Sequence, residues 1–160
     1  MSSHYQLLTG EAEYREACDR ILGLAQREIM IFDRELLALR PNDKARLDIL
    51  ASFLQGVGPQ RIRMVLHNPE PLMRDAPRLI QLIARFSHAI EVRQSPDNLR
   101  HLADTHVLAD ENNGVRRFQY DQPRSALILD DPAYLSPWRQ RFEELWELSQ
   151  PCLSLNTTGL

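Results

Sequence analysis

The sequence predicts an α/β domain in which a mixed β-sheet carries helices on both faces. Apolar runs of strand length, at residues 28–33, 61–67 and 89–94, alternate with segments of helical periodicity. Strands separated by helices are usually joined by right-handed crossovers and pair in parallel. Residues 105–130 then hold three strand-like segments with turn residues between them, which predicts antiparallel pairing on the same sheet. The predicted order is α-β-α-β-α-β-β-β-β-α.

Four helices account for the remaining periodic segments. The first covers residues 11–27, where apolar side chains recur at helical spacing. The second covers residues 44–55, and Gly56 is a suitable C-terminal stop. Asp75 can cap the third, which follows a proline-rich loop. The last begins at Ser136 and Pro137, ends at Pro151 and has a strong apolar face made of Trp138, Phe142, Leu145 and Trp146.

The hairpin within residues 105–120 has a predicted register. Asn113-Gly114 tolerates the positive φ angles of a type I′ turn, so these two residues are the expected loop. This register places Asp110 opposite Arg117 and His106 opposite Asp121. The face turned to the core would then carry Val107, Ala109, Phe118 and Tyr120.

Composition limits the classes of function. A chain of 160 residues with 43% hydrophobic and 26% charged residues predicts one globular domain over residues 1–160, with 151–160 as a loose tail. The net charge of −3 gives no reason to expect a nucleic-acid partner. Neither a signal peptide nor a run of bilayer length is apparent, so we expect a cytoplasmic protein without membrane contact. Cys18 and Cys152 are too few for a disulfide framework.

The predicted order, with a histidine-bearing strand before a turn, a closing strand and a tryptophan-bearing last helix, resembles one half of a phospholipase D superfamily protein over most of the chain. The family motif is H-x-K-x-x-x-x-D, usually followed by Gly-Ser. Here His106 occupies the histidine position, while Leu108 replaces the lysine and Asn113 the aspartate. Gln119-Tyr120 stands where Gly-Ser is expected. The resemblance implies a phospholipase D-like fold whose nucleophilic histidine has lost the cation that stabilises the phosphoryl group.

A second resemblance is to uncharacterised bacterial domains found alone or behind GNAT-type acetyltransferase domains. It implies an acetyltransferase as a candidate partner. The chain itself has no acetyl-CoA loop of the Q/R-x-x-G-x-G/A type.

Four side chains are candidate site residues. His106 is either a relic nucleophile paired with Asp121 or an ordinary strand histidine. His67 ends a strand where ligand sites of α/β proteins open, or is a polar strand end. Arg117, next to Arg116 in sequence, could bind phosphate or an acidic partner, or belong to a charge-balanced surface. The histidines have no standard metal-site spacing, so we expect no metal and no cofactor.

Two functions remain open. The leading hypothesis is a catalytically inactive phospholipase D-like module for binding or accessory roles. The alternative is a metal-independent phosphodiesterase or phosphotransferase that pairs two copies of His106 across a homodimer, because the family's reaction needs two histidines. A homodimer is expected in either case, through Trp138 and Trp146 on the last helix, unless both tryptophans are buried in the domain's own core.

Overall fold

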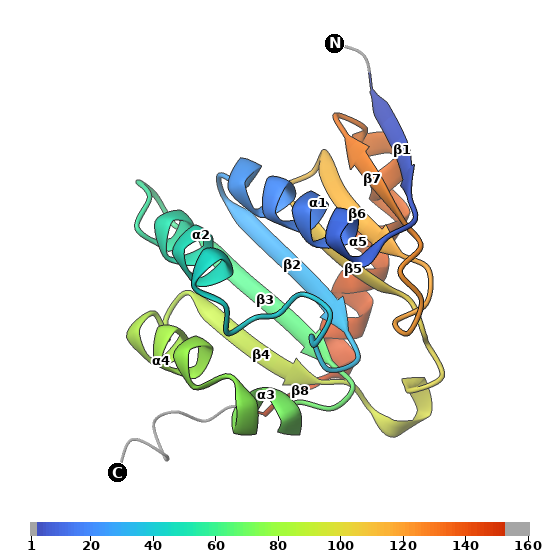
Figure 1. Cartoon of the computed structure of the whole chain (residues 1–160). Coiled ribbons are helices and arrows are strands. Elements are labelled where there is room, and N and C mark those ends of the chain that lie inside the picture. The colour runs from blue at the N-terminus through green and yellow to red at the C-terminus, as the bar shows by residue number, and fades with distance from the viewer. Residues whose placement is uncertain (1–2, 153–160) are drawn as a thin grey trace.

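Eight strands form one sheet in the order β1-β7-β6-β5-β2-β3-β4-β8. The computed structural model describes residues 3–152 (Figure 1). The elements, in chain order, are β1 (His4–Leu8), α1 (Glu11–Leu24), β2 (Glu28–Asp33), α2 (Lys44–Leu54), β3 (Arg61–Leu66), α3 (Glu70–Asp75), α4 (Pro77–Arg85), β4 (Ile90–Gln94), the short 3₁₀ helix η1 (Asp97–Leu99), β5 (Thr105–Ala109), β6 (Asn113–Arg117), β7 (Ser125–Leu129), α5 (Pro132–Leu148) and β8 (Gln150–Pro151).

The predicted mixed sheet is confirmed. β2, β3 and β4 are parallel neighbours, as expected for strands joined through helices. β5 pairs antiparallel with β2, and β6, β7 and β1 continue the antiparallel half. Parallel pairing therefore ends at β2 on one side and at β4 on the other, where β8 pairs antiparallel.

The sheet is buried on both faces by helices from different parts of the chain. α1, α2 and α4 lie in front of it in Figure 1, and α5 lies behind it. Side chains alternate along β2, so Ile31 packs beneath the front helices while Met30 and Phe32 pack against α5. An unbroken apolar strand is the pattern that such two-sided burial requires.

Both outermost strands were missed by the sequence prediction. β1 is an edge strand in which only Leu8 is buried, so it lacks an apolar run. β8 pairs with β4 through Gln150 and Pro151, which corrects the expectation of a tail that is loose from residue 151. Residues 153–160 of that predicted tail lie outside the described part of the chain.

Two helix boundaries also differ from the prediction. The proline-rich loop expected before Asp75 is partly helical, because Pro71 sits in the first turn of α3, where its missing N–H costs nothing. α5 begins at Pro132 rather than at Ser136, since the side chain of Asp131 accepts a hydrogen bond from the Tyr134 N–H and caps it.

The predicted register of the β5–β6 hairpin is wrong. Ala109 pairs with Asn113 and His106 with Arg116, so the loop consists of residues 110–112. Asp110 takes the positive φ angle, 55°, that we assigned to Asn113-Gly114. Val107 and Ala109 face the front helices as predicted, opposite His106. The shift overturns the rest of that predicted face, because Phe118 packs in the α5 cluster and Tyr120 is exposed.

Gly114 is needed for close packing and not for a turn. A Cβ atom at this position would lie 2.8 Å from Leu108 Cδ2 and 3.3 Å from Leu135 Cδ2. The absent side chain therefore lets Leu135 of α5 approach the backbone of β6.

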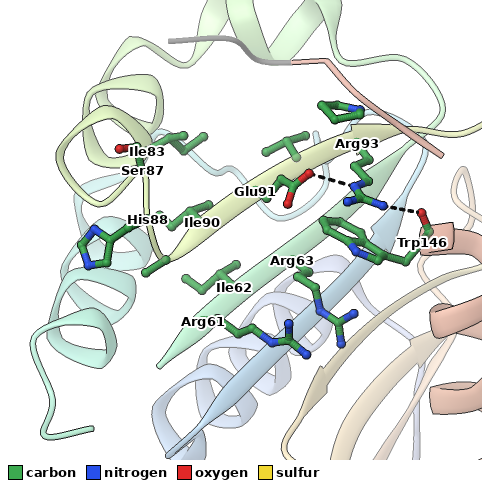
Figure 2. Close-up of a pocket in the computed structure, with 13 residues that line it drawn as sticks. Arg61, Ile62, Arg63, Ile83, Ser87, His88, Ile90, Glu91, Arg93 and Trp146 are labelled. Carbon is green, nitrogen blue, oxygen red and sulfur yellow. Dashed lines mark hydrogen bonds and ion pairs between the residues drawn. The ribbon is translucent and has the colours of Figure 1, made fainter. Parts of the chain in front are cut away.

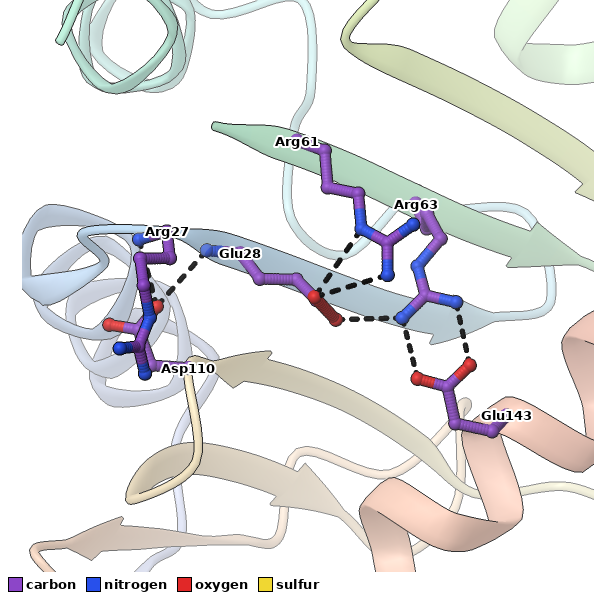
Figure 3. Close-up of polar contacts among 6 residues, drawn as sticks. All are labelled: Arg27, Glu28, Arg61, Arg63, Asp110 and Glu143. Carbon is purple, nitrogen blue, oxygen red and sulfur yellow. Dashed lines mark hydrogen bonds and ion pairs between the residues drawn. The ribbon is translucent and has the colours of Figure 1, made fainter. Parts of the chain in front are cut away.

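The hairpin loop is joined to the start of β2 by one carboxylate. Asp110 accepts hydrogen bonds from the backbone N–H groups of Gln26, Arg27 and Glu28 at 3.0, 2.9 and 3.0 Å. Figure 3 shows this contact beside the arginines of β3. The three bonds satisfy donors that the α1–β2 turn would otherwise leave open.

Candidate functional site

His106 is enclosed by aromatic side chains on the α5 face of the sheet. Its ring centroid lies 5.7 Å from that of Phe32 and 5.8 Å from that of Phe142, and the residue is 1% exposed. Neither ring nitrogen has a hydrogen-bond partner among the described residues. Burial lowers the pKa of His106 well below its usual value, and the positive charges of Arg141 and Arg116 lower it further.

The other two motif positions are used in internal packing. Leu108 points to the same face as His106 and is fully buried. Its Cδ2 lies where a side chain on Gly114 would otherwise project. The Asn113 side chain accepts a hydrogen bond of 3.0 Å from the Asp130 N–H. No cation therefore stands where the family motif has its lysine.

His67 also lies on the α5 face, on the far side of Phe32 from His106. Its Nε2 lies 2.8 Å from the Leu102 carbonyl oxygen and its Nδ1 lies 2.5 Å from Ser95 Oγ. Because a carbonyl only accepts, Nε2 carries the proton and the Ser95 hydroxyl donates to Nδ1. Burial lowers the pKa of His67, although the Leu102 carbonyl opposes this shift. Both nitrogens are thus occupied in holding the loop after β4.

Arg117 and Asp121 come together on the opposite side, at the carboxyl end of β2. They line a pocket of about 300 Å³ together with Asp33 and Glu11. Arg117 is 2% exposed and binds Glu11 through two parallel bonds of 2.6 and 2.9 Å. His106 points to the other face of the sheet, so the predicted pair of His106 with Asp121 does not form.

Asp33 forms part of this pocket and was not among the predicted site residues. Burial raises its pKa to about 6, while hydrogen bonds from backbone N–H groups of the following loop, including Arg34 at 2.6 Å, oppose the shift. Its place at the carboxyl end of an apolar strand was the available signal. A carboxyl group with a pKa raised to about 6 beside a buried guanidinium suits polar binding.

A larger groove of about 550 Å³ is lined by residues of β3 and β4 and by Trp146 of α5 (Figure 2). The guanidinium of Arg93 lies 4.0 Å from the ring centroid of Trp146, donates to the Trp146 carbonyl and pairs with Glu91. Arg63 is 5% exposed in its side chain and pairs with Glu28 and Glu143. The alternation of arginines in RIRMVLH was the sequence signal for this groove, but each cation already has an acidic partner.

The aromatic face of the last helix is buried within the domain. Phe142 is fully buried, Leu145 is 4% exposed and Trp146 is 6% exposed, all packed against the sheet. Trp138 is half-buried and stacks on Arg116 at 3.4 Å. The exposed aromatic face from which we predicted a homodimer is therefore wrong for Phe142, Leu145 and Trp146, which lie in the domain's own core. The homodimer itself stays a prediction.

Residues 3–152 include no group of three or more His, Cys, Asp or Glu side chains arranged to hold a metal ion. In the same range, none of the helices combines the length and apolar character needed to cross a bilayer.

Comparison with solved structures identifies the fold as phospholipase D-like. Nuc from Salmonella typhimurium, described as a phospholipase D family member, has a TM-score of 0.67 at 13% identity, covering 96% of this chain and 100% of that one. Phosphatidylserine synthase from Haemophilus influenzae has a TM-score of 0.64 at 12% identity, covering 98% and 42%. At such identities the likeness concerns the fold alone. A search of curated proteins finds no match to the sequence.

The expectation that the chain has no nucleic-acid partner is corrected by a further comparison. TrmBL2, described as an archaeal chromatin protein with a novel mode of DNA binding, has a TM-score of 0.69 at 16% identity. The match covers 92% of this chain and 54% of TrmBL2, so the chain spans about half the length of that protein. The expectation relied on the net charge, but the fold occurs in a DNA-binding protein and contact depends on local charge.

The family of the chain follows from a match of its sequence to a family model. A family model described as "Domain of unknown function (DUF7931)" matches residues 10–157, nearly the whole chain. The protein is a phospholipase D-like α/β domain that belongs to the DUF7931 family.

Proposed function

We propose that this protein is a catalytically inactive phospholipase D-like domain that acts as a binding or accessory module. The observation that carries the proposal is the setting of His106. A histidine that attacks phosphorus must reach its substrate, whereas His106 is 1% exposed between Phe32 and Phe142.

The motif positions around His106 support the same conclusion. Leu108 is fully buried where the family motif has a lysine, so developing negative charge would meet an apolar side chain. Arg141, the cation that packs on Phe32 nearby, is held by Asp104 at 2.6 Å. The alternative, a phosphodiesterase using two copies of His106, needs this ring at a surface.

Turnover of simple phosphodiesters tests the proposal. Purified protein should release no product from bis(p-nitrophenyl) phosphate or from a labelled oligonucleotide, and acid-labile phosphohistidine should not accumulate. His106→Ala and the exposed-histidine control His101→Ala should both match the wild type. Activity that disappears in a folded His106→Ala protein and persists in His101→Ala would overturn the proposal.

A further inference from the structure

α5 covers only part of the sheet face on its side. Next to it, at the antiparallel edge of the sheet, lies a strip of cationic and aromatic side chains. It consists of Tyr5, Arg116, Phe118, Arg124, Tyr134 and Trp138, and we call it the β1–α5 strip. The strand register defines its sheet half, because Tyr5 pairs with Ile128 and Arg116 with Ala126, two residues that pack beneath α5. α5 supplies Tyr134 and Trp138 along its border.

Cations and aromatic rings alternate in this strip. Arg116 lies 3.4 Å from the ring centroid of Trp138 and 5.7 Å from that of Phe118, and its Nη1 donates to Tyr134 Oη at 3.0 Å. The guanidinium of Arg124 lies 5.9 Å from the Phe118 ring. Tyr5 contacts Tyr134 edge to face at 5.6 Å and is 48% exposed.

The two arginines of the strip carry uncompensated charge. Within residues 3–152, neither Arg116 nor Arg124 has a carboxylate within ion-pair distance, whereas Arg63, Arg117 and Arg141 are all paired. Arg116 is held in place by Trp138 and Tyr134 rather than by an acid. A fixed guanidinium without an acidic partner is preorganised to bind a phosphate oxygen, here through its Nη groups, because Nε of Arg116 is buried.

We propose that the β1–α5 strip binds single-stranded nucleic acid. Arg116 and Arg124 would hold backbone phosphates, and exposed rings such as Tyr5 would stack with bases, the combination by which proteins bind single strands without sequence preference. Two free cations are few for a duplex, where binding relies on many phosphate contacts. The net charge of −3 does not oppose this, since charges beyond about 10 Å are largely screened at physiological salt.

This inference rests on the proposed function as a binding module, because it names the class of ligand that the module binds. The inference and the proposed function can nevertheless fail separately. An alternative ligand for the strip is a protein segment rich in acidic and aromatic residues, which the same two arginines could attract. Base stacking on the exposed Tyr5 favours the nucleic acid, because all six residues of the strip are arginines or aromatic residues and none is aliphatic.

Fluorescence anisotropy with a short fluorescein-labelled oligothymidylate tests the inference on the full chain. We expect saturable binding that weakens as salt is raised from about 50 to about 200 mM. The double variant Tyr5→Ala/Arg124→Ala should raise Kd by about tenfold or more. Arg20→Ala, which removes an exposed arginine from α1 on the opposite face, is the matched control and should bind as the wild type does. Circular dichroism should show that all variants are folded.

Absence of binding by the wild type at low salt would overturn the inference. So would an equal loss of affinity in Arg20→Ala and the double variant, or tighter binding of a labelled Glu- and Tyr-rich peptide that displaces the oligonucleotide. The same probe run on a denaturing gel separates the two proposals: cleavage that depends on His106 refutes catalytic inactivity and leaves binding intact, whereas a probe that is neither bound nor cut refutes the binding inference alone.

Discussion

Arg63 and Glu143 join the sheet to α5 through two parallel hydrogen bonds of 2.7 Å each. Arg63 comes from the middle of β3 and Glu143 from the second half of α5. Figure 3 shows the two side chains pointing toward each other. The Arg63 side chain is 5% exposed, so it depends on acidic partners, and Glu28 supplies the second at 2.7 Å. The pair fixes α5 over the strand that borders the arginine groove.

Glu143→Gln should lower the free energy of unfolding by about 1 kcal/mol, because it leaves a buried guanidinium with one carboxylate. The effect is modest since Glu143 is half-exposed and screened by water. The hydrogen bond from Arg63 lowers the pKa of Glu143, so this stabilisation is present above pH ~4.3 and is lost as pH falls through the lower folded value. Urea unfolding checks it, with Glu144→Gln as the exposed control; equal stability of both variants would contradict a role in docking α5.

His106→Leu should be at least as stable as the wild type at pH 7.5, because it removes two ring nitrogens that have no partner in the described structure. The folded pKa of His106 is well below the unfolded value of about 6.5, so acidification protonates only the unfolded chain and lowers stability. Below pH about 6.5, the free energy of unfolding should therefore fall less steeply in the variant than in the wild type, by up to about 1.4 kcal/mol per pH unit. Urea unfolding between pH 7.5 and 5 measures the slope, and His101→Leu is the control. A marked loss of stability at pH 7.5 would mean that the imidazole makes a polar interaction in solution.

Asp33→Asn should show the opposite pH dependence. The folded pKa of about 6 exceeds the unfolded value of about 3.9, so the wild type gains stability from the protonated carboxyl group at low pH and loses it as pH rises through 6. Relative to the wild type, the variant should gain about 2 kcal/mol between pH 4 and 7.5, because an amide has no charge to desolvate. Thermal unfolding at both pH values checks this against Asp121→Asn at the rim of the same pocket. A constant difference between wild type and Asp33→Asn would show that Asp33 titrates normally.

The sequence predicts those parts of the fold whose residues are buried on both faces. The run EIMIFD becomes β2 because each of its residues after Glu28 is buried, and such a run has few alternatives. β1 has one buried residue and is held by backbone pairing with β7, which leaves no apolar pattern to read. Strand identity is thus readable where packing decides it, and unreadable where hydrogen bonding alone does.

The candidate site was predicted less well, because it depends on register. A tight turn at Asn113-Gly114 was the best local interpretation, but the positive φ of Asp110 and the packing of Leu135 on Gly114 set a different loop. That shift separates His106 from Asp121 and places them on opposite faces. The β1–α5 strip could not be foreseen either. Its central contact, between Arg116 and Trp138, joins two separate elements and depends on how α5 crosses β6.

Gly114→Ala should lower the free energy of unfolding by about 1–3 kcal/mol, because its Cβ would lie 2.8 Å from Leu108 Cδ2 in a closely packed layer. Gly23→Ala is the matched control: a Cβ there meets no atom within 4 Å, and alanine favours the helix, so this variant should gain up to about 1 kcal/mol. Adding Leu108→Val should restore part of the loss in Gly114→Ala, since it shortens the side chain that clashes. Urea unfolding measures all three proteins. If Gly114→Ala were as stable as the wild type, Gly114 would be dispensable for packing, and the turn that we first assigned to it would again need to be considered.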